Sequence, residues 1–195
     1  YINSPDLVLL QNDNLQPWEL IDNLEGILLL HLSNLGNDYV IENNIAIHKT
    51  ATIEEGVTLK GTIIISENCF IGAHAYLRGP IFLSNSVTIG PSSEIKQSII
   101  ADHSTVAHFN FVGNSIIGQH VNFEAGSLCA NHYNERQDKR IMVKYKNEIV
   151  DTKTEKFGAL VGDHSKIGAN AVLSPGTILE PFSVVKRLEL VEQVK

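Results

Sequence analysis

Three basic residues of this chain are spaced by eighteen: Lys60, Arg78 and Lys96. If residues eighteen apart lie one above another, these side chains form a ladder of three positive charges. Two such charges about 5 Å apart repel by a few kcal/mol at most at a surface-like effective dielectric. An anion bound between them would offset that repulsion, and phosphate or pyrophosphate suits lysine and arginine donors. The alternative is that the long side chains simply extend apart into water.

A histidine on the neighbouring face is the candidate base. His108 falls in the same eighteen-residue register as Gly72 and Gly90, so we expect it to stand above two residues that leave room for a ligand. Glu94 precedes His108 by fourteen residues and could orient the imidazole and raise its basicity. The alternatives are that the glycines only suit tight corners and that a histidine between apolar residues is structural.

The elements that would position these residues follow a period of six. From Ile47 to Ile95, and on to Ala101 and Ala107, every sixth residue is apolar, and the residue four places later is small or apolar. This period fits neither an α-helix nor a simple strand, and it is typical of a parallel β-helix of hexapeptide repeats. Three hexads close a coil of eighteen residues, and coils stack at about 4.8 Å, as neighbouring strands do. We therefore predict an all-β parallel β-helix.

The N-terminal residues 1–41 depart from the repeat. Leu7–Leu10 could form a short strand, and an amphipathic helix is expected to begin at Pro17. Because an open coil exposes strand edges and an apolar core, we predict that this segment caps the first coil; a linker to another domain is the alternative.

The repeats are predicted to form one domain over residues 42–186, with a phase slip at 113–116. A charged insert at 130–157 interrupts them, and it should leave the coil as a protruding loop that carries a hairpin around Lys146 and Asn147. Residues 187–195 are expected to be a polar C-terminal tail.

Composition limits the class of function. The net charge of −7 argues against nucleic acid or an acidic membrane as the main partner, although an anionic small molecule needs only a local basic site. Cys69 and Cys129 fall on apolar positions of the repeat, which predicts buried free thiols. No secretory signal is visible and the apolar runs are too short to span a bilayer, so we expect a cytoplasmic protein.

Four short motifs together resemble a known family. Residues 94–96 (EIK), 107–114 (AHFNFVGN), 121–126 (VNFEAG) and 129–131 (CAN) are similar to the acetyltransferase half of the bifunctional sugar-1-phosphate nucleotidylyltransferases, which make UDP-N-acetylglucosamine. The resemblance covers about residues 15–186. It implies a left-handed β-helix that forms a homotrimer and binds acetyl-CoA between its subunits.

The resemblance also implies catalytic roles. His108 matches the general base that takes a proton from the acceptor amine, and Glu94 matches the carboxylate that supports it. Asn131 matches a residue that holds the acceptor sugar or steadies the reacting groups. Where the family usually has tyrosine, this chain has Phe111, so a hydroxyl that is thought to assist the substrate is absent.

Binding roles follow in the same way. The substrate-binding residues, with the ladder included, are predicted to be Lys60, Arg78, Lys96, Asn122 and Phe111. Ala169 lies where the family lines the acetyl-CoA channel. Three basic residues of the insert, Arg136, Lys139 and Arg140, could bind the CoA phosphates or close the site of a neighbouring subunit, and the alternative for them is a solvated charged hairpin.

The main hypothesis is therefore acetyl transfer from acetyl-CoA to an amino group of a phosphorylated or nucleotide-linked sugar. No metal is required, and nucleotidyltransferase activity is not expected, because the glycine-rich nucleotide loop of that half is missing. One alternative is a metal enzyme like the γ-class carbonic anhydrases, since His103 and His108 have an H-x4-H spacing. The other is a non-catalytic scaffold, which the loss of the hydroxyl at Phe111 would suit.

Overall fold

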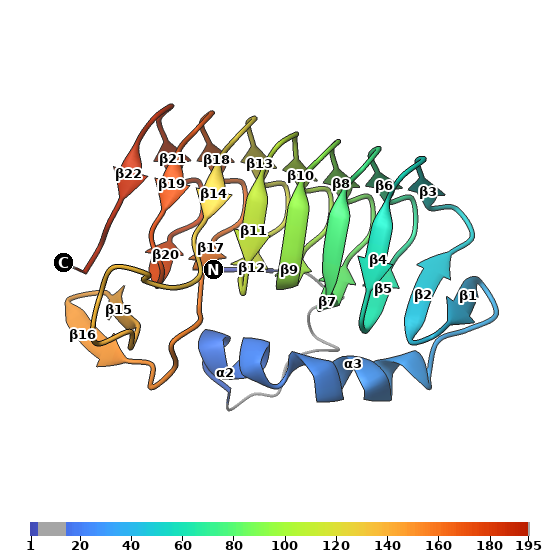
Figure 1. The fold of residues 1–195 in the computed structure, drawn as a ribbon, viewed down its shortest axis with the longest axis horizontal. Coiled ribbons are helices and arrows are strands. Elements are labelled where there is room, and N and C mark those ends of the chain that lie inside the picture. Colours follow the sequence, from blue (N-terminus) through green and yellow to red (C-terminus); the bar gives the residue numbers. More distant parts are fainter. Residues whose placement is uncertain (4–14, 195) are drawn as a thin grey trace.

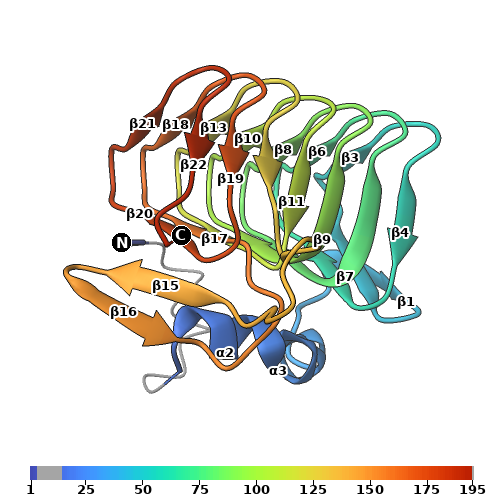
Figure 2. The same ribbon diagram turned by 60° about the vertical axis from the view of Figure 1, so that its left-hand side comes forward.

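The computed structural model describes residues 1–3 and 15–194, so the strand predicted at Leu7–Leu10 lies outside the described residues. Short parallel strands stack coil upon coil into a solenoid with three faces, and two helices run along one side of it (Figures 1 and 2). The fold is a left-handed parallel β-helix with an N-terminal helical segment and a protruding loop, as predicted.

Two faces of the solenoid carry no helix. The first, here called the Phe111 face, is formed by β4 (Thr58–Lys60), β7 (Tyr76–Leu83), β9 (Glu94–Ile100), β11 (Phe111–Gly113), β14 (Leu128–Cys129), β19 (Val172–Leu173) and β22 (Leu190–Val191). The second, the Asn122 face, is formed by β3 (Thr52–Ile53), β6 (Phe70–Ile71), β8 (Thr88–Ile89), β10 (Thr105–Val106), β13 (Asn122–Phe123), β18 (Lys166–Ile167) and β21 (Val184–Val185).

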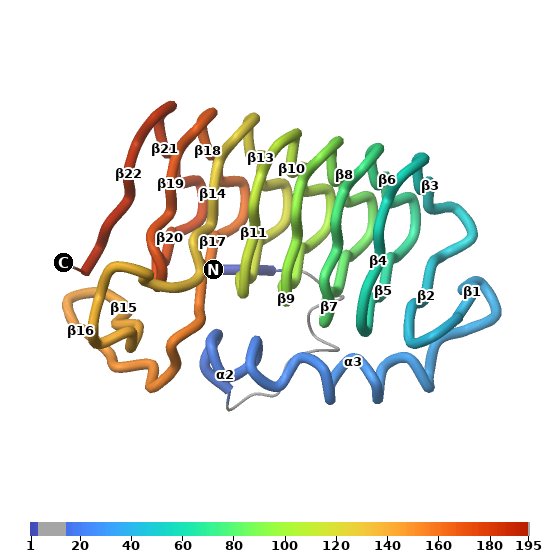
Figure 3. Tube along the Cα trace, in the orientation of Figure 1, coloured from blue at the N-terminus to red at the C-terminus, as the bar shows by residue number. Residues whose placement is uncertain are grey.

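The third face lies under the helices. It is formed by β2 (Ile45–His48), β5 (Ile63–Ile65), the ends of the long strands β7 and β9, β12 (Ile116–Ile117), β17 (Ala159–Val161) and β20 (Thr177–Leu179). The tube in Figure 3 shows how each coil passes through all three faces before it steps to the next. Inward side chains from the three faces form one continuous apolar column, which includes both cysteine thiols.

The register of the coils changes at one place. Arg78 pairs with Lys96, eighteen residues on, but Ile81 pairs with Ser98, seventeen residues on. Two residues of β7, Gly79 and Pro80, thus oppose one residue of β9, which is a β-bulge. In the coils that follow, up to the insert, neighbouring strands keep the seventeen-residue offset, with Thr88 beside Thr105 and Glu94 beside Phe111. After the insert the offset is eighteen again, with Lys166 beside Val184.

This bulge corrects the predicted grid. The inward residues after Ile95 are Ile100 and Val106, one position before the predicted Ala101 and Ala107. The slip predicted at 113–116 is therefore preceded by an earlier one. The earlier slip cannot be seen in the sequence, because the residues here are apolar whether they point inward or outward. Ile99, for example, is fully buried, but it lies on the outer side of the coil under the helices.

The helices α2 (Pro17–Asp22) and α3 (Leu24–Leu32) form because a capping box at Gln16 and a proline at the first position start an apolar stripe. The stripe packs on the outward residues of the third face rather than over the open end of the first coil. Its buried members are Trp18, Ile21, Leu24, Leu28 and Leu32. No helix in residues 1–3 and 15–194 is long and apolar enough to cross a membrane.

The two ends of the stack are finished differently. At the first coil, β1 (Tyr39–Glu42) pairs antiparallel with β2, so the edge strand is covered. At the last coil, β22 pairs with β19, which extends the solenoid into the segment 187–195 where we expected only a polar tail. The insert forms the predicted hairpin, with β15 (Met142–Tyr145) antiparallel to β16 (Glu148–Asp151).

Two glycine substitutions test this packing. A Cβ at Gly90 would overlap the carbonyl group of Ala107 in the next coil, so Gly90→Ala should lower the free energy of unfolding by about 2 kcal/mol or more. Gly26, inside α3, has open space around it, so Gly26→Ala should raise stability by up to about 1 kcal/mol. Urea unfolding of both variants measures the contrast, and a neutral Gly90→Ala would contradict the coil register.

Candidate functional site

The predicted ladder of charge is present on the Phe111 face. Lys60 pairs with Arg78 and Arg78 with Lys96 in the parallel register of β4, β7 and β9. The guanidinium of Arg78 forms an ion pair with Glu94, which accepts from Nε at 2.9 Å. Glu94 was expected to support His108, but among the described residues no hydrogen bond joins these two side chains. Arg78 is therefore the partner that orients Glu94.

Tyr76 adds an aromatic surface that the sequence did not single out. Its ring lies in the column of Glu94 and Phe111, and it is close to two ladder cations: Nζ of Lys60 is 5.2 Å and Cζ of Arg78 is 5.5 Å from the ring centroid. Cations over an aromatic ring are attracted to its negative face. The ring thus offsets part of the repulsion within the ladder.

A fourth cation reaches the ladder from the insert. The pKa of Lys96 is lowered, first by burial and then by the positive charges of Lys156 and Arg78, while Glu94 opposes the shift. Lys156 lies sixty residues away in sequence and arrives where the insert rejoins the coil, with Phe157 donating its backbone N–H to the carbonyl of Asn131 at 3.1 Å. Sequence spacing could not have found it, because the length of the insert sets its position.

Asn131 and Phe111 meet at the top of the ladder. Gly113 stacks directly on Lys96. A Cβ at Gly113 would lie 2.6 Å from Cζ of Phe111 and 3.0 Å from Cγ of Asn131. The absent side chain is what lets the ring edge and the amide approach each other there. Lys96, Phe111 and Asn131 therefore share one corner of the Phe111 face.

His108 lies on the edge between the two open faces, and its predicted stacking is wrong. Because of the bulge, Gly90 lies beneath Ala107, and His108 falls above Pro91 instead. The imidazole is exposed and packs edge-on against Phe109, with ring centroids 5.7 Å apart. His108 is still only three residues before Phe111 on the same coil.

Ala169 stacks on the same edge as His108. The carbonyl of His108 accepts from Gly126, that of Ala125 from Asn170, and that of Ala169 from Leu188, each at 3.0 Å. These bonds place four residues of successive coils in one column: His108, Ala125, Ala169 and Arg187. The predicted base and the predicted cofactor contact are thus brought together by the fold.

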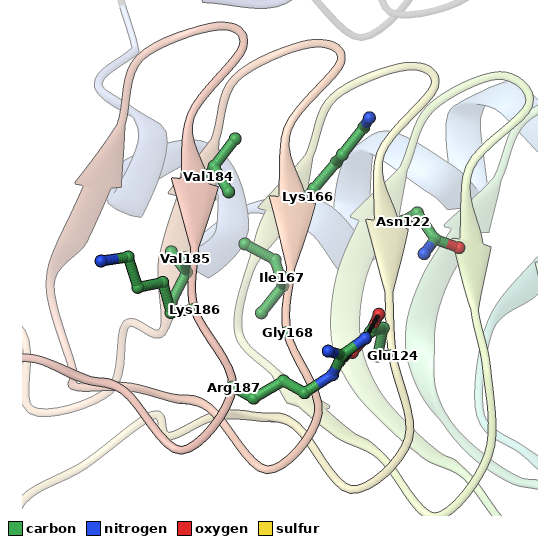
Figure 4. Close-up of a pocket in the computed structure, with 9 residues that line it drawn as sticks. All are labelled: Asn122, Glu124, Lys166, Ile167, Gly168, Val184, Val185, Lys186 and Arg187. Atoms are coloured by element: carbon green, nitrogen blue, oxygen red, sulfur yellow. Dashed lines mark hydrogen bonds and ion pairs between the residues drawn. The ribbon is translucent and has the colours of Figure 1, made fainter.

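A shallow groove of about 450 Å³ runs beside this edge on the Asn122 face (Figure 4). Glu124 bridges it: one carboxylate oxygen accepts from the N–H of Ala169 and from Nε of Arg187, both at 2.9 Å, and the other from the Arg187 guanidinium at 2.8 Å. These bonds lower the pKa of Glu124. The groove is lined by Asn122, Glu124, Lys166, Ile167, Gly168, Val184, Val185, Lys186 and Arg187.

Comparison with known proteins identifies the family. Residues 41–150 match the model of the GMPPB C-terminal domain. The chain belongs to this family. It is 34% identical over 176 residues to a bifunctional sugar-1-phosphate nucleotidylyltransferase/acetyltransferase of Sulfurisphaera tokodaii, and the matched region covers 86% of this chain and 43% of that protein. It is also 34% identical over 180 residues to the bifunctional protein GlmU of Methanococcus vannielii, covering 89% and 42%.

These relatives confirm the resemblance predicted from the four motifs. The chain spans about two fifths of the length of the curated relatives that it matches. Among solved structures, a GDP-perosamine N-acetyl transferase mutant of Caulobacter crescentus, in complex with CoA and GDP-perosamine, is 14% identical. That comparison covers 75% of this chain and 51% of the other, with a TM-score of 0.27.

The basic residues of the insert make local contacts in this family member. Arg136 lies 3.5 Å from the ring centroid of Tyr133 and pairs with Glu192. Arg140 pairs with Asp138 and Asp151, and it lowers the pKa of Asp138 to about 2. Lys139 is exposed. None of the three contacts Ala169 or Glu124 in the hydrogen bonds and ion pairs of the described residues.

The two histidines of the metal hypothesis lie at opposite ends of β10. His103 belongs to a stack at another corner, where its ring lies 4.9 Å from that of His120, which in turn stacks on His164 at 4.9 Å. Over residues 1–3 and 15–194, no three histidine, cysteine or acidic side chains converge in a way that could hold a metal ion.

Anion binding at the ladder can be tested without knowledge of the reaction. A lowered pKa means that the protonated form of Lys96 is less favourable in the folded chain than in the unfolded chain. A bound phosphate would offset this cost, so phosphate should raise Tm by about 2–4 °C over chloride at equal ionic strength. Lys96→Met should abolish this gain. Lys49→Met, an exposed control whose Nζ lies 3.5 Å from Asp38, should keep it, because general salt effects act on both variants. Equal gains in both would contradict an anion site on the ladder.

Proposed function

We propose that this chain transfers an acetyl group from acetyl-CoA to an amino group of a phosphorylated or nucleotide-linked sugar. The observation that carries this proposal is the ladder of three cations, which Lys156 joins as a fourth. The ladder lies beside Asn131, on the face whose edge bears His108. Anions are held by such clusters through charge-assisted hydrogen bonds. The similarity to acetyltransferase-containing enzymes supports the choice of reaction.

In the proposed reaction the acceptor amine attacks the thioester carbonyl and forms a C–N bond, which gives a tetrahedral intermediate; the C–S bond breaks when that intermediate collapses. His108 takes the proton of the amine and returns it to the departing CoA thiolate. An Nδ2 hydrogen of Asn131, or a backbone N–H, stabilises the oxyanion of the tetrahedral intermediate. The ladder fixes the phosphate and thereby positions the amine.

The groove on the Asn122 face is the proposed site for CoA. Val184, which is 70% exposed, gives it an apolar side chain for the pantetheine arm, and Lys166, Lys186 and Arg187 offer charges for its phosphates. Ala169 borders the groove through its hydrogen bond to Glu124. Acetyl-CoA is thus expected as co-substrate, with no metal.

A homotrimer is part of the proposal. The two open faces expose large apolar side chains near the last coils, while helices cover the third face. These exposed residues include Phe182, Val184, Leu188 and Leu190, at 62–79% of their full accessibility. Contact between copies would bury them and bring one copy's groove beside another copy's ladder. We place the enzyme in the cytoplasm, without a nucleic acid or membrane partner.

The direct test is release of CoA thiol from acetyl-CoA with a panel of amino-sugar phosphates and nucleotide-linked amino sugars. His108→Ala should lower kcat by about 100-fold or more, the typical contribution of a general base. His74→Ala, at an exposed histidine on another coil, is the matched control and should be unaffected. Absence of turnover with every acceptor, or full activity in His108→Ala, would overturn the proposal.

The bridge across the groove gives a second test. Glu124 occupies Arg187 and the N–H of Ala169, and its negative charge opposes an anionic ligand. Glu124→Ala should therefore tighten CoA binding about fivefold in calorimetry, roughly 1 kcal/mol. Glu67→Ala, an exposed carboxylate on a distant coil, should not. Unchanged or weaker binding by Glu124→Ala would place CoA elsewhere.

A further inference from the structure

The side-chain amide of Asn131 is held from two sides. Its Nδ2 donates to Oδ1 of Asn114 at 2.6 Å, and its Oδ1 lies 3.2 Å from Nδ1 of His132. Asn131 is 6% exposed and Asn114 is 1% exposed, so the two amides meet away from water. Their backbones are also fixed, because Asn114 donates its N–H to the carbonyl of Lys96 at 2.9 Å.

The first of these hydrogen bonds determines the second. An amide oxygen only accepts, so Oδ1 of Asn114 takes an N–H of Asn131, and the oxygen of Asn131 is turned towards His132. Because that oxygen also only accepts, a hydrogen bond between it and Nδ1 of His132 requires the proton to be on Nδ1. A half-turn of the Asn131 amide alone would set oxygen against oxygen at Asn114 and N–H against N–H at His132, and the buried mismatch at Asn114 costs about 1–3 kcal/mol.

We propose that His132 is a positioning residue, which holds the amide of Asn131 in one orientation by donating its Nδ1–H. The part of this inference that concerns acyl transfer by way of Asn131 rests on the proposed function. The contacts of Asn131 with Asn114 and His132 do not depend on it. His132 is exposed and immediately follows Asn131 in the chain.

The contacts of Asn114 and His132 with the Asn131 amide, here called the clamp, prepare Asn131 to stabilise negative charge. One Nδ2 hydrogen and one Oδ1 lone pair stay unused by Asn114 and His132, and the amide itself lies beside Gly113 and the ring of Phe111. A donor that is already oriented stabilises an oxyanion without reorganisation, and an N–H donated to the amide oxygen polarises the amide further. Phe111 has no hydroxyl, so this amide supplies a polar group next to the ring.

The tautomer of His132 tests the clamp independently of activity. Protein labelled with ¹⁵N-histidine is observed by NMR at alkaline pH, where imidazoles are neutral, and His132 is assigned by its absence in His132→Asn. We expect the proton on Nδ1, whereas an imidazole free in water favours Nε2. Asn131→Ala should return His132 to the Nε2–H form. A wild-type His132 protonated on Nε2, or an equal mixture of both forms, would overturn the proposal.

Kinetics then test the positioning role. Asparagine places an N–H donor where Nδ1 of histidine lies, whereas glutamine places it where Nε2 lies. His132→Asn should therefore keep kcat within about twofold, and His132→Gln should lose about fivefold, the value of one hydrogen bond, with KM for both substrates unchanged. Equal losses in the two variants, or a loss carried by KM, would contradict it. If the wild type transfers no acetyl group, the proposed function fails, and the tautomer still decides whether the clamp exists.

Discussion

The hydrogen-bond register between neighbouring coils places the candidate site residues that lie on the coils. Each coil donates its backbone N–H groups to the coil beside it, and inward apolar residues hold the coils together as one column. A short strand of two or three residues cannot be stable alone, so its position is set by its neighbours. Side chains far apart in sequence therefore become a ladder or an edge through the offset between coils.

The bulge at Gly79 and Pro80 changes that offset from eighteen to seventeen, and the site depends on the change. With an unbroken offset of eighteen, Asn114 would lie on Lys96. With seventeen, Gly113 lies there instead, and its missing side chain admits the ring of Phe111 and the amide of Asn131. The pairs of the ladder keep the eighteen-residue offset, whereas the coil that follows Lys96 keeps the seventeen-residue offset. This second offset is what brings the amide of Asn131 next to Lys96.

The sequence was sufficient for the fold and for the ladder, because the pairs Lys60–Arg78 and Arg78–Lys96 both keep the eighteen-residue offset, which changes only after Arg78. It was insufficient for His108, whose neighbours in the coil below depend on a slip hidden by the apolar run around Ile99 and Ile100. Lys156 and Tyr76 were missed for different reasons. The first arrives through the geometry of the insert, and the second belongs to a strand pattern in which a half-buried tyrosine is ordinary.

The central claim is that an anionic sugar is held by the ladder while CoA lies along the edge of Ala169. A crystal structure with CoA and glucosamine 1-phosphate tests it most directly. The account predicts the phosphate within hydrogen-bond reach of Lys96 and Arg78, and the pantetheine arm beside Ala169 with the Glu124 bridge opened. A sugar phosphate bound away from the ladder, or CoA bound with the bridge to Arg187 intact, would contradict it.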